Sequence, residues 1–151
     1  MSFSAWVTIG FVDRHESIVG MIRTLCDAGW SVTPPDYEGP ISFYLEHAPG
    51  ECDWGCLPTE QALATLGEYD QKGQACGLQL YWAANDPLAE LCIELHLRPA
   101  QNQLAISIFG PRMILDDVAP FTDLSWYSKN IVGPLKRSGL AVRELQWHES
   151  D

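Results

Sequence analysis

The chain has 151 residues, of which 46% are hydrophobic, and a formal net charge of −11. This length supports one ordinary hydrophobic core, so we expect a single domain over residues 1–151. No apolar run approaches the roughly 18 residues that a membrane-spanning helix needs. No positive charge precedes Arg14, which argues against a secretory signal. We therefore expect a cytoplasmic protein whose five cysteines are reduced.

All of the net negative charge lies in the first two thirds of the chain. Residues 1–97 contain 14 acidic and 3 basic residues, whereas residues 98–151 contain 6 of each. Between Arg23 and Lys72 there are nine acidic residues and no basic one. Such a surface repels nucleic acid and anionic membranes and attracts basic partners. The alternative is that the surplus acid only keeps the protein in solution.

The N-terminal part predicts a buried strand followed by an amphipathic helix. Residues 3–12 are rich in aromatic and β-branched side chains, which favour a strand. We expect the helix to begin at Asp13, with Glu16 reaching back to complete a capping box. Gly29 is placed to end it. Apolar residues at helical spacing predict the buried stripe, which consists of Ile18, Met21, Ile22 and Leu25.

Two short strands, a loop and a second helix are expected next. Residues 30–33 and 41–46 predict strands, and Pro34 stops the first of them. Residues 47–58 predict a loop because they include two glycines and two prolines. Residues 59–71 predict a helix that Gly67 weakens. Its inward stripe is Ala62, Leu63, Leu66 and Tyr69.

The strongest strand signal lies between residues 77 and 109. Apolar and polar residues alternate without exception over 89–98, as expected for a strand with one buried and one exposed face. Residues 78–82 and 104–108 alternate in the same way, and turn-forming residues separate the three segments. This predicts a three-stranded antiparallel meander whose apolar face the helices cover.

The C-terminal part predicts one helix between two strands. A short strand is expected over 112–117, a helix over 124–137 and a last strand over 140–148. Pro134 should kink or split the helix because it has no N–H to donate. The whole chain thus predicts an α+β fold, with a mostly antiparallel sheet of about seven or eight strands and three helices packed on one face.

One candidate metal site lies in the predicted loop. His47, Cys52 and Cys56, with Asp53 between the cysteines, offer side chains that zinc binds. A closed zinc site needs four ligands and normally a second cysteine pair downstream, which this sequence lacks. We therefore expect no metal and no other cofactor. The alternative roles of these cysteines are reduced thiols or, under oxidising conditions, a Cys52–Cys56 disulfide.

A candidate catalytic group lies on the polar face of the central strand. Glu90, Glu94 and His96 point the same way and would suit acid–base chemistry or cation binding. The alternative is an ordinary water-facing side of an antiparallel sheet, without the shielding that catalysis needs. The sequence has no glycine-rich phosphate loop, no Gly-x-Ser-x-Gly and no His-Glu-x-x-His. We expect a non-enzymatic protein, with a small-ligand or metal-dependent enzyme as the alternative.

A candidate binding surface combines acids with large aromatic side chains in two predicted loops. Its residues are Asp36, Tyr37 and Glu38 before the strand at 41–46, and Glu51, Asp53 and Trp54 after it. Aromatic anchors amid charges of one sign are typical of protein interfaces. The alternative is that the two rings fold back onto the core. We expect these six residues to bind a partner.

The combination of small size, acidity, α+β pattern and acidic–aromatic segments at 36–38 and 53–54 resembles the immunity proteins of bacterial toxin systems. The resemblance covers size, charge and composition, and assigns no role to any single residue. It implies a bacterial cytoplasmic protein that neutralises a cognate toxin by covering its often basic active site. The expected partner is therefore a basic protein, and not nucleic acid or a membrane.

Overall fold

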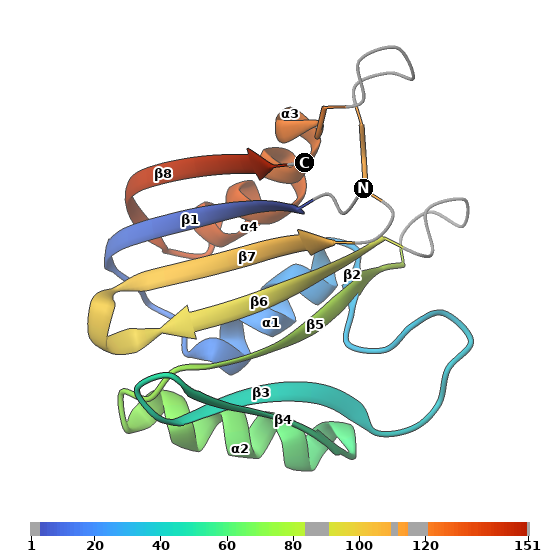
Figure 1. Cartoon of the computed structure of the whole chain (residues 1–151), viewed down its shortest axis with the longest axis vertical. Helices are drawn as coiled ribbons and strands as arrows, with labels where there is room; N and C mark the ends of the chain where they lie inside the picture. The colour runs from blue at the N-terminus through green and yellow to red at the C-terminus, as the bar shows by residue number, and fades with distance from the viewer. Residues whose placement is uncertain (1–3, 84–90, 110–111, 115–120, 151) are drawn as a thin grey trace.

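An antiparallel sheet of eight strands, covered by helices on one face, forms the fold (Figure 1). The computed structural model describes residues 4–83, 91–109, 112–114 and 121–150. The predicted α+β class, the antiparallel sheet and the helices on one face are confirmed.

The strands do not follow the order of the chain. They are β1 (Ser4–Asp13), β2 (Trp30–Ser31), β3 (Ile41–Ala48), β4 (Glu51–Leu57), β5 (Cys76–Trp82), β6 (Cys92–Arg98), β7 (Gln103–Phe109) and β8 (Ala141–Ser150). The order in the sheet is β4-β3-β5-β6-β7-β1-β8, and the short β2 pairs with β5. The first strand therefore lies between two strands from the last third of the chain, and β4 and β8 are the edges.

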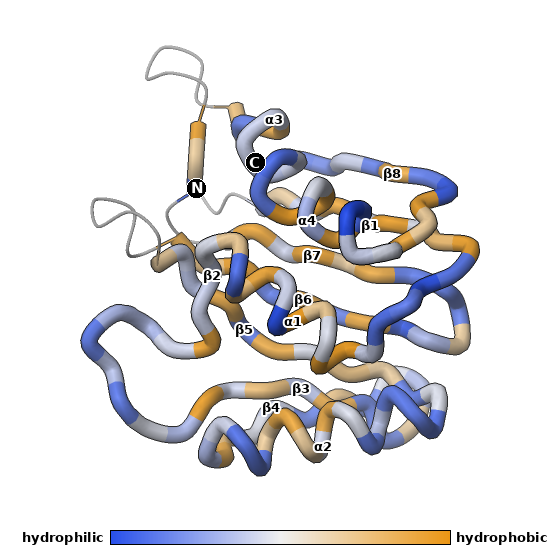
Figure 2. The backbone as a smooth tube through the Cα atoms, turned by 180° about the vertical axis from the view of Figure 1, so that it is seen from behind, coloured by the Kyte–Doolittle hydropathy of each residue, from blue (hydrophilic) through white to orange (hydrophobic). Residues whose placement is uncertain are grey.

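Three helical segments lie on the same side of the sheet (Figures 1 and 2). They are α1 (Ile18–Asp27), α2 (Thr59–Gln71) and a C-terminal segment of α3 (Leu124–Tyr127), the π-helical η3 (Ser128–Val132) and α4 (Gly133–Arg137). A short 3-10 turn, η2 (Pro99–Gln101), joins β6 to β7. None of the described helices is long and apolar enough to cross a membrane.

Helix α1 buries the predicted stripe but begins later than expected. Its N-cap is Ser17, whose hydroxyl accepts from the Gly20 N–H, because β1 continues as far as Asp13. The predicted capping box at Asp13 is therefore wrong, and the Glu16 carboxylate instead accepts from the Thr24 hydroxyl at 3.0 Å. The apolar stripe is confirmed as buried: Ile18, Met21, Ile22 and Leu25.

The C-terminal helix is split as predicted. Pro134 has no N–H to donate to the carbonyl of Asn130, four residues earlier, and the helix widens to a π-turn just before it. The indole Nε1 of Trp30 donates to this Asn130 carbonyl at 2.9 Å. The helix ends near Gly139, whose φ of 110° suits glycine. The strand predicted over 112–117 is reduced, in the described residues, to one bridge at Ile114.

The predicted meander is confirmed as β5, β6 and β7. Ile93 of β6 lies opposite Leu80 of β5 and Ile108 of β7. The apolar residues of these strands form the floor of the core, and several are fully buried: Leu78, Leu80, Ile93, Leu95, Leu97, Leu104 and Ile106. Residues 89 and 90 lie outside the described part of the chain. The helices thus cover the face that alternation predicted to be apolar.

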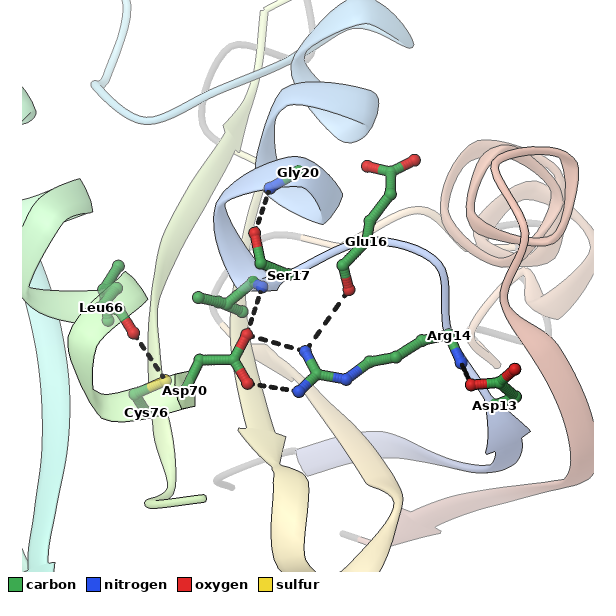
Figure 3. A network of polar contacts seen from close by, with 9 residues as sticks. Asp13, Arg14, Glu16, Ser17, Gly20, Leu66, Asp70 and Cys76 are labelled. Atoms are coloured by element: carbon green, nitrogen blue, oxygen red, sulfur yellow. Dashed lines mark hydrogen bonds and ion pairs between the residues drawn. The ribbon is translucent and has the colours of Figure 1, made fainter. Parts of the chain in front are cut away.

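A partly buried ion pair connects β1 and α1 to α2 (Figure 3). Arg14, just after β1, places both terminal nitrogens on the Asp70 carboxylate near the end of α2; the Nη1–Oδ2 distance is 2.8 Å. Asp70 is only 6% exposed, and it also accepts the Ile18 N–H at 2.7 Å. A carboxylate this buried is stable because one guanidinium and one backbone N–H satisfy it.

Candidate functional site

The segment predicted as a loop over residues 47–58 is half of a β-hairpin. β3 extends to Ala48, Pro49 and Gly50 form the turn, and β4 runs from Glu51 to Leu57. Gly50 has a φ of 81°, which only glycine adopts easily. The loop prediction was wrong because Pro49, Gly50 and Pro58 flank β4 and Gly55 fits within it, while Cys52, Trp54 and Cys56 alternate with their neighbours along the strand.

Trp54 lies exposed at the centre of β4, on the face of the sheet opposite to the one that the described helices cover. Its side chain is 47% exposed. The ring centroid lies 5.7 Å from that of Tyr44 on β3 and 6.3 Å from that of His96 on β6. Tyr44 and His96 meet edge to face at 4.8 Å. We call these three residues the aromatic cluster.

Gly77 allows the aromatic cluster to form across three strands. It lies on β5, directly between Tyr44 of β3 and His96 of β6. A Cβ atom at this position would overlap the carbonyl oxygen of Leu95. With no side chain at residue 77, the two rings approach each other over the glycine backbone. This arrangement also shields that strand from water.

His96 is held in place by Glu94, its neighbour on the same face of β6. The Nε2–Oε2 distance is 3.1 Å, and the two side chains are only 16% and 24% exposed. The pair is therefore more shielded than an open strand face would suggest. A carboxylate bonded to an imidazole is a geometry that acid–base chemistry can use. Glu90, the third candidate of this group, lies outside the described residues.

Two polar contacts support Tyr44 from the turn end of the hairpin. Its hydroxyl lies 2.9 Å from the Cys52 sulfur and donates to Glu46 at 3.3 Å. Burial raises the pKa of the Tyr44 hydroxyl, and the neighbouring Cys52 and Glu46 shift it in the same direction. A hollow of about 520 Å³ begins beside Tyr44 and extends to Arg98. Tyr44 is therefore a neutral, fixed ring that backs Trp54.

Asp53 points to the opposite side of β4 from Trp54. Its carboxylate lies 2.9 Å from the Nε2 atom of His47, and the Asp53 side chain is 73% exposed. The other ring nitrogen of His47 lies 2.9 Å from the hydroxyl of Tyr69 on α2. Asp53 therefore borders the helix-covered face, whereas Trp54 belongs to the open face. The two predicted binding residues share an edge but not a face.

The candidate zinc ligands do not converge. Cys52 and Cys56 point to the open face, whereas His47 and Asp53 point toward α2. Among the described residues, no group of three His, Cys, Asp or Glu side chains could hold a metal ion. The Cys52–Cys56 disulfide is also excluded while β4 is intact, because residues four apart in a strand are about 13 Å apart and a disulfide needs less than about 7 Å.

The other predicted binding segment is the exposed loop between β2 and β3. Asp36 has a φ of 60°, and Tyr37 is 45% exposed with its hydroxyl donating to the Pro40 carbonyl at 3.2 Å. A hollow of about 560 Å³ lies between this loop, including Glu38, and Ala83. Tyr37 and Trp54 are therefore both exposed, and neither ring folds back into the core.

The six predicted residues surround the β3–β4 hairpin without forming one patch. The loop with Asp36, Tyr37 and Glu38 lies next to the start of β3, which pairs with the end of β4. Glu51 lies at the opposite end, beside the turn. All six are exposed. The binding-surface prediction missed Tyr44, although the alternation in residues 41–46 places it opposite to the apolar side chains, and it assigned His96 only to the candidate catalytic group.

The acidic charge is concentrated around this hairpin. Exposed acids on the β2–β3 loop, on β4 and at the start of α2 are Asp36, Glu38, Glu51, Asp53 and Glu60. Of the three bases before residue 98, Arg14 is bound to Asp70, while Arg23 and Lys72 lie on or beside the helices. The β4 edge therefore carries charge of one sign beside exposed aromatic rings.

Comparison of the chain with protein-family models, with curated proteins and with solved structures finds no match, so its function is inferred from the geometry and charge of this surface.

Proposed function

We propose that this protein is a non-enzymatic binding protein that captures a basic protein partner at the β3–β4 hairpin. The observation that carries the proposal is the half-exposed Trp54 ring, held by Tyr44 and His96 at the acidic edge of the sheet. A tryptophan that is already ordered loses little conformational freedom on binding. Such rings are the usual anchors of protein interfaces.

The surrounding charge supports a basic partner. Acids on the hairpin and the adjacent loop attract a positively charged surface over the Debye length, which is about 8 Å at physiological ionic strength. A surplus of acid that served only solubility would need no fixed aromatic cluster beside it. Aromatic anchoring and charge steering together give both residence time and association rate.

Toxin neutralisation is the biological role that we propose for this binding. A toxin that acts on nucleic acid or another anion has a basic active site, and an acidic hairpin with a rigid aromatic centre is suited to cover it. The proposal includes a cytoplasmic location in a bacterium, where an immunity protein protects the cell that produces the toxin.

The test begins with co-expression of the chain and the product of the adjacent gene, followed by purification and binding kinetics. Glu51→Lys should lower the association rate at low salt and have less effect at high salt, because its carboxylate acts through long-range attraction. Trp54→Ala should raise the dissociation rate and weaken binding by about 2 kcal/mol or more.

Glu144→Lys is the matched control for charge reversal. Glu144 is exposed on β8, in the part of the chain whose charges balance. Glu149 is a poorer control because its carboxylate accepts the Thr122 N–H at 2.6 Å. If Glu144→Lys weakens binding as much as Glu51→Lys, or if no partner is retained at low salt, the acidic surface serves solubility and the proposed function is wrong.

A further inference from the structure

The outer edge of β4 is an unpaired strand edge. β4 is the last strand of the sheet on its side, and no strand in the described part of the chain pairs with its outer edge. Five of its seven residues are exposed. It contains no proline and no basic residue, which are common devices that prevent strand addition at an edge.

The hydrogen bonds of β3 show which β4 residues direct their backbone outward. The Glu46 N–H donates to the carbonyl of Ala75, the residue before β5, so Glu46 directs its backbone groups toward β5. Successive residues of a strand alternate in this direction. Leu45 therefore directs its groups toward β4, where it pairs with Asp53. Asp53 bonds back to β3, and its neighbours Cys52 and Trp54 direct their N–H and C=O groups outward.

The same alternation directs the backbone groups of Cys56 outward. A row of outward donors and acceptors thus runs along β4 at Cys52, Trp54 and Cys56. These are also the residues whose side chains lie on the open face, because the register places them opposite Glu46, Tyr44 and Ser42. Strand addition at this edge would extend the sheet and place the new strand beside the Trp54 ring.

We propose that an extended basic segment of the partner adds to β4 as a further antiparallel or parallel strand. This inference rests on the proposed function and specifies how that partner binds. Residues directly opposite each other on paired strands share a face. Basic side chains of the added strand would lie beside Glu51 and Asp53, and apolar side chains on its other face would lie beside Trp54. The partner segment therefore alternates basic and apolar residues.

The acidic charge of the β4 edge favours a basic strand of a partner over a second copy of the chain. Two β4 edges pairing with each other would bring the carboxylates of Glu51 and Asp53 toward those of the other copy, and like charges on paired strands destabilise a sheet. The other edge, β8, is different because Arg143 and Glu144 give it charges of both signs. An acidic edge with an aromatic centre and no base favours a basic strand.

The test uses a short peptide of alternating lysine and valine with blocked ends, added to the nitrogen-15-labelled full chain. Amide hydrogen exchange should slow by about tenfold or more at Cys52, Trp54 and Cys56, whose N–H groups become bonded. Exchange at Asp53 and Gly55, already bonded to β3, should change much less. Uniform slowing along β4, or no change at saturating peptide, would overturn strand addition.

Two substitutions at one position provide the second measurement. Cys56→Pro removes an outward N–H that makes no bond in the free sheet, so the melting temperature should change little. It should weaken peptide binding about tenfold or more, by removing one bond and placing the proline ring at the edge. Cys56→Ser retains the N–H and should bind within about twofold of the unchanged protein. Equal binding by both variants contradicts the inference.

Three controls distinguish attraction by charge from strand addition, and strand addition from the proposed function. Oligolysine without valines should bind more weakly than the alternating peptide; equal binding would indicate attraction without strand pairing and overturn the inference. A protein partner that is lost with Glu51→Lys but retained with Cys56→Pro keeps the proposed function and overturns strand addition. Sedimentation that shows a dimer abolished by Cys56→Pro would assign the edge to a second copy instead.

Discussion

The two faces of the sheet differ in what they contribute to the molecule. On the covered face, Val7, Ile9 and Ile93 are fully buried. On the open face, Trp6 of the interior strand β1 and Trp54 of the edge strand β4 are 37% and 47% exposed. The covered face provides the free energy of folding, and the open face presents fixed side chains at little cost to stability. Substitutions on the two faces should therefore have very different effects.

Removal of the guanidinium that neutralises the buried Asp70 should have the largest effect. Arg14→Ala leaves the Asp70 carboxylate, which is 6% exposed, without its cation. We expect the free energy of unfolding to fall by about 3–5 kcal/mol, as for other buried pairs that lose one partner. Urea denaturation at pH 7 measures this change.

The matched substitution on the open face is Glu94→Gln, which removes the charge of the His96–Glu94 pair. The amide can still accept a hydrogen bond, and we expect a loss of about 1 kcal/mol or less. A larger loss from Glu94→Gln than from Arg14→Ala would contradict the assignment of stability to the covered side.

Truncation in the core should have the next largest effect. Ile93→Ala removes a fully buried side chain at the centre of the meander, and we expect a loss of about 2–5 kcal/mol. Ser107→Ala, on the open face of the neighbouring strand, should stay within about 0.5 kcal/mol. Wild-type stability of Ile93→Ala, measured by urea denaturation, would show that the two faces are assigned the wrong way round.

Gly77→Ala tests a position on the open face where, unlike at its neighbours, a substitution should destabilise the protein. The added methyl would meet the Leu95 carbonyl, so β5 and β6 must move apart, at a cost of about 1–3 kcal/mol. Gly67 in α2 is the control, since a Cβ there meets only the Val19 side chain at 3.7 Å. Gly67→Ala should raise stability by about 0.5–1 kcal/mol. Thermal unfolding of the two variants should therefore show melting temperatures shifted in opposite directions.

Alkaline pH should produce the most gradual loss, spread over several pH units. Burial raises the pKa of the Cys76 and Cys92 thiols from an ordinary 9.0 to about 12, and the acids Asp70 and Glu94 act in the same direction. The folded protein keeps these protons while the unfolded chain loses them. Their contribution is complete below pH 9 and is lost as the pH rises toward 12, by about 1.4 kcal/mol per pH unit for each thiol.

Urea denaturation between pH 8 and pH 11 measures this slope. Cys92 is informative because it lies on the open-face side of β6 yet is only 9% exposed. If Cys92 ionises like an exposed thiol, Cys92→Ser will leave the alkaline slope unchanged. Cys92 would then behave like any other residue of the open face.

Local sequence patterns predicted the helices and strands themselves better than they predicted which of these elements lie side by side. The stripe ending in Leu25 and the alternation around Ile93 record which side chains avoid water, and both predictions were confirmed. The aromatic cluster was not predicted because Trp54, Tyr44 and His96 meet only through strand order. Sequence spacing carries little information on which strands pair across a sheet.

Two local errors have the same origin, which is that the extent of a strand was not predicted. Asp13 and Ser17 both have capping side chains, and the length of β1 decides in favour of Ser17. In residues 47–58, turn residues were counted by composition, although Pro49 and Gly50 alone make the turn. The Arg14–Asp70 pair escaped prediction because its two residues lie far apart in the chain.

The place of β1 between β7 and β8 determines when the protein can finish folding. During synthesis, β3 and β4 can pair as soon as they leave the ribosome, because both strands and their turn are neighbours in sequence. β1 has to wait for strands made from the last third of the chain. Pulse-labelling hydrogen exchange should show protection of β3 amides before those of β1. The acidic hairpin would thus be assembled while the other edge of the sheet is still incomplete.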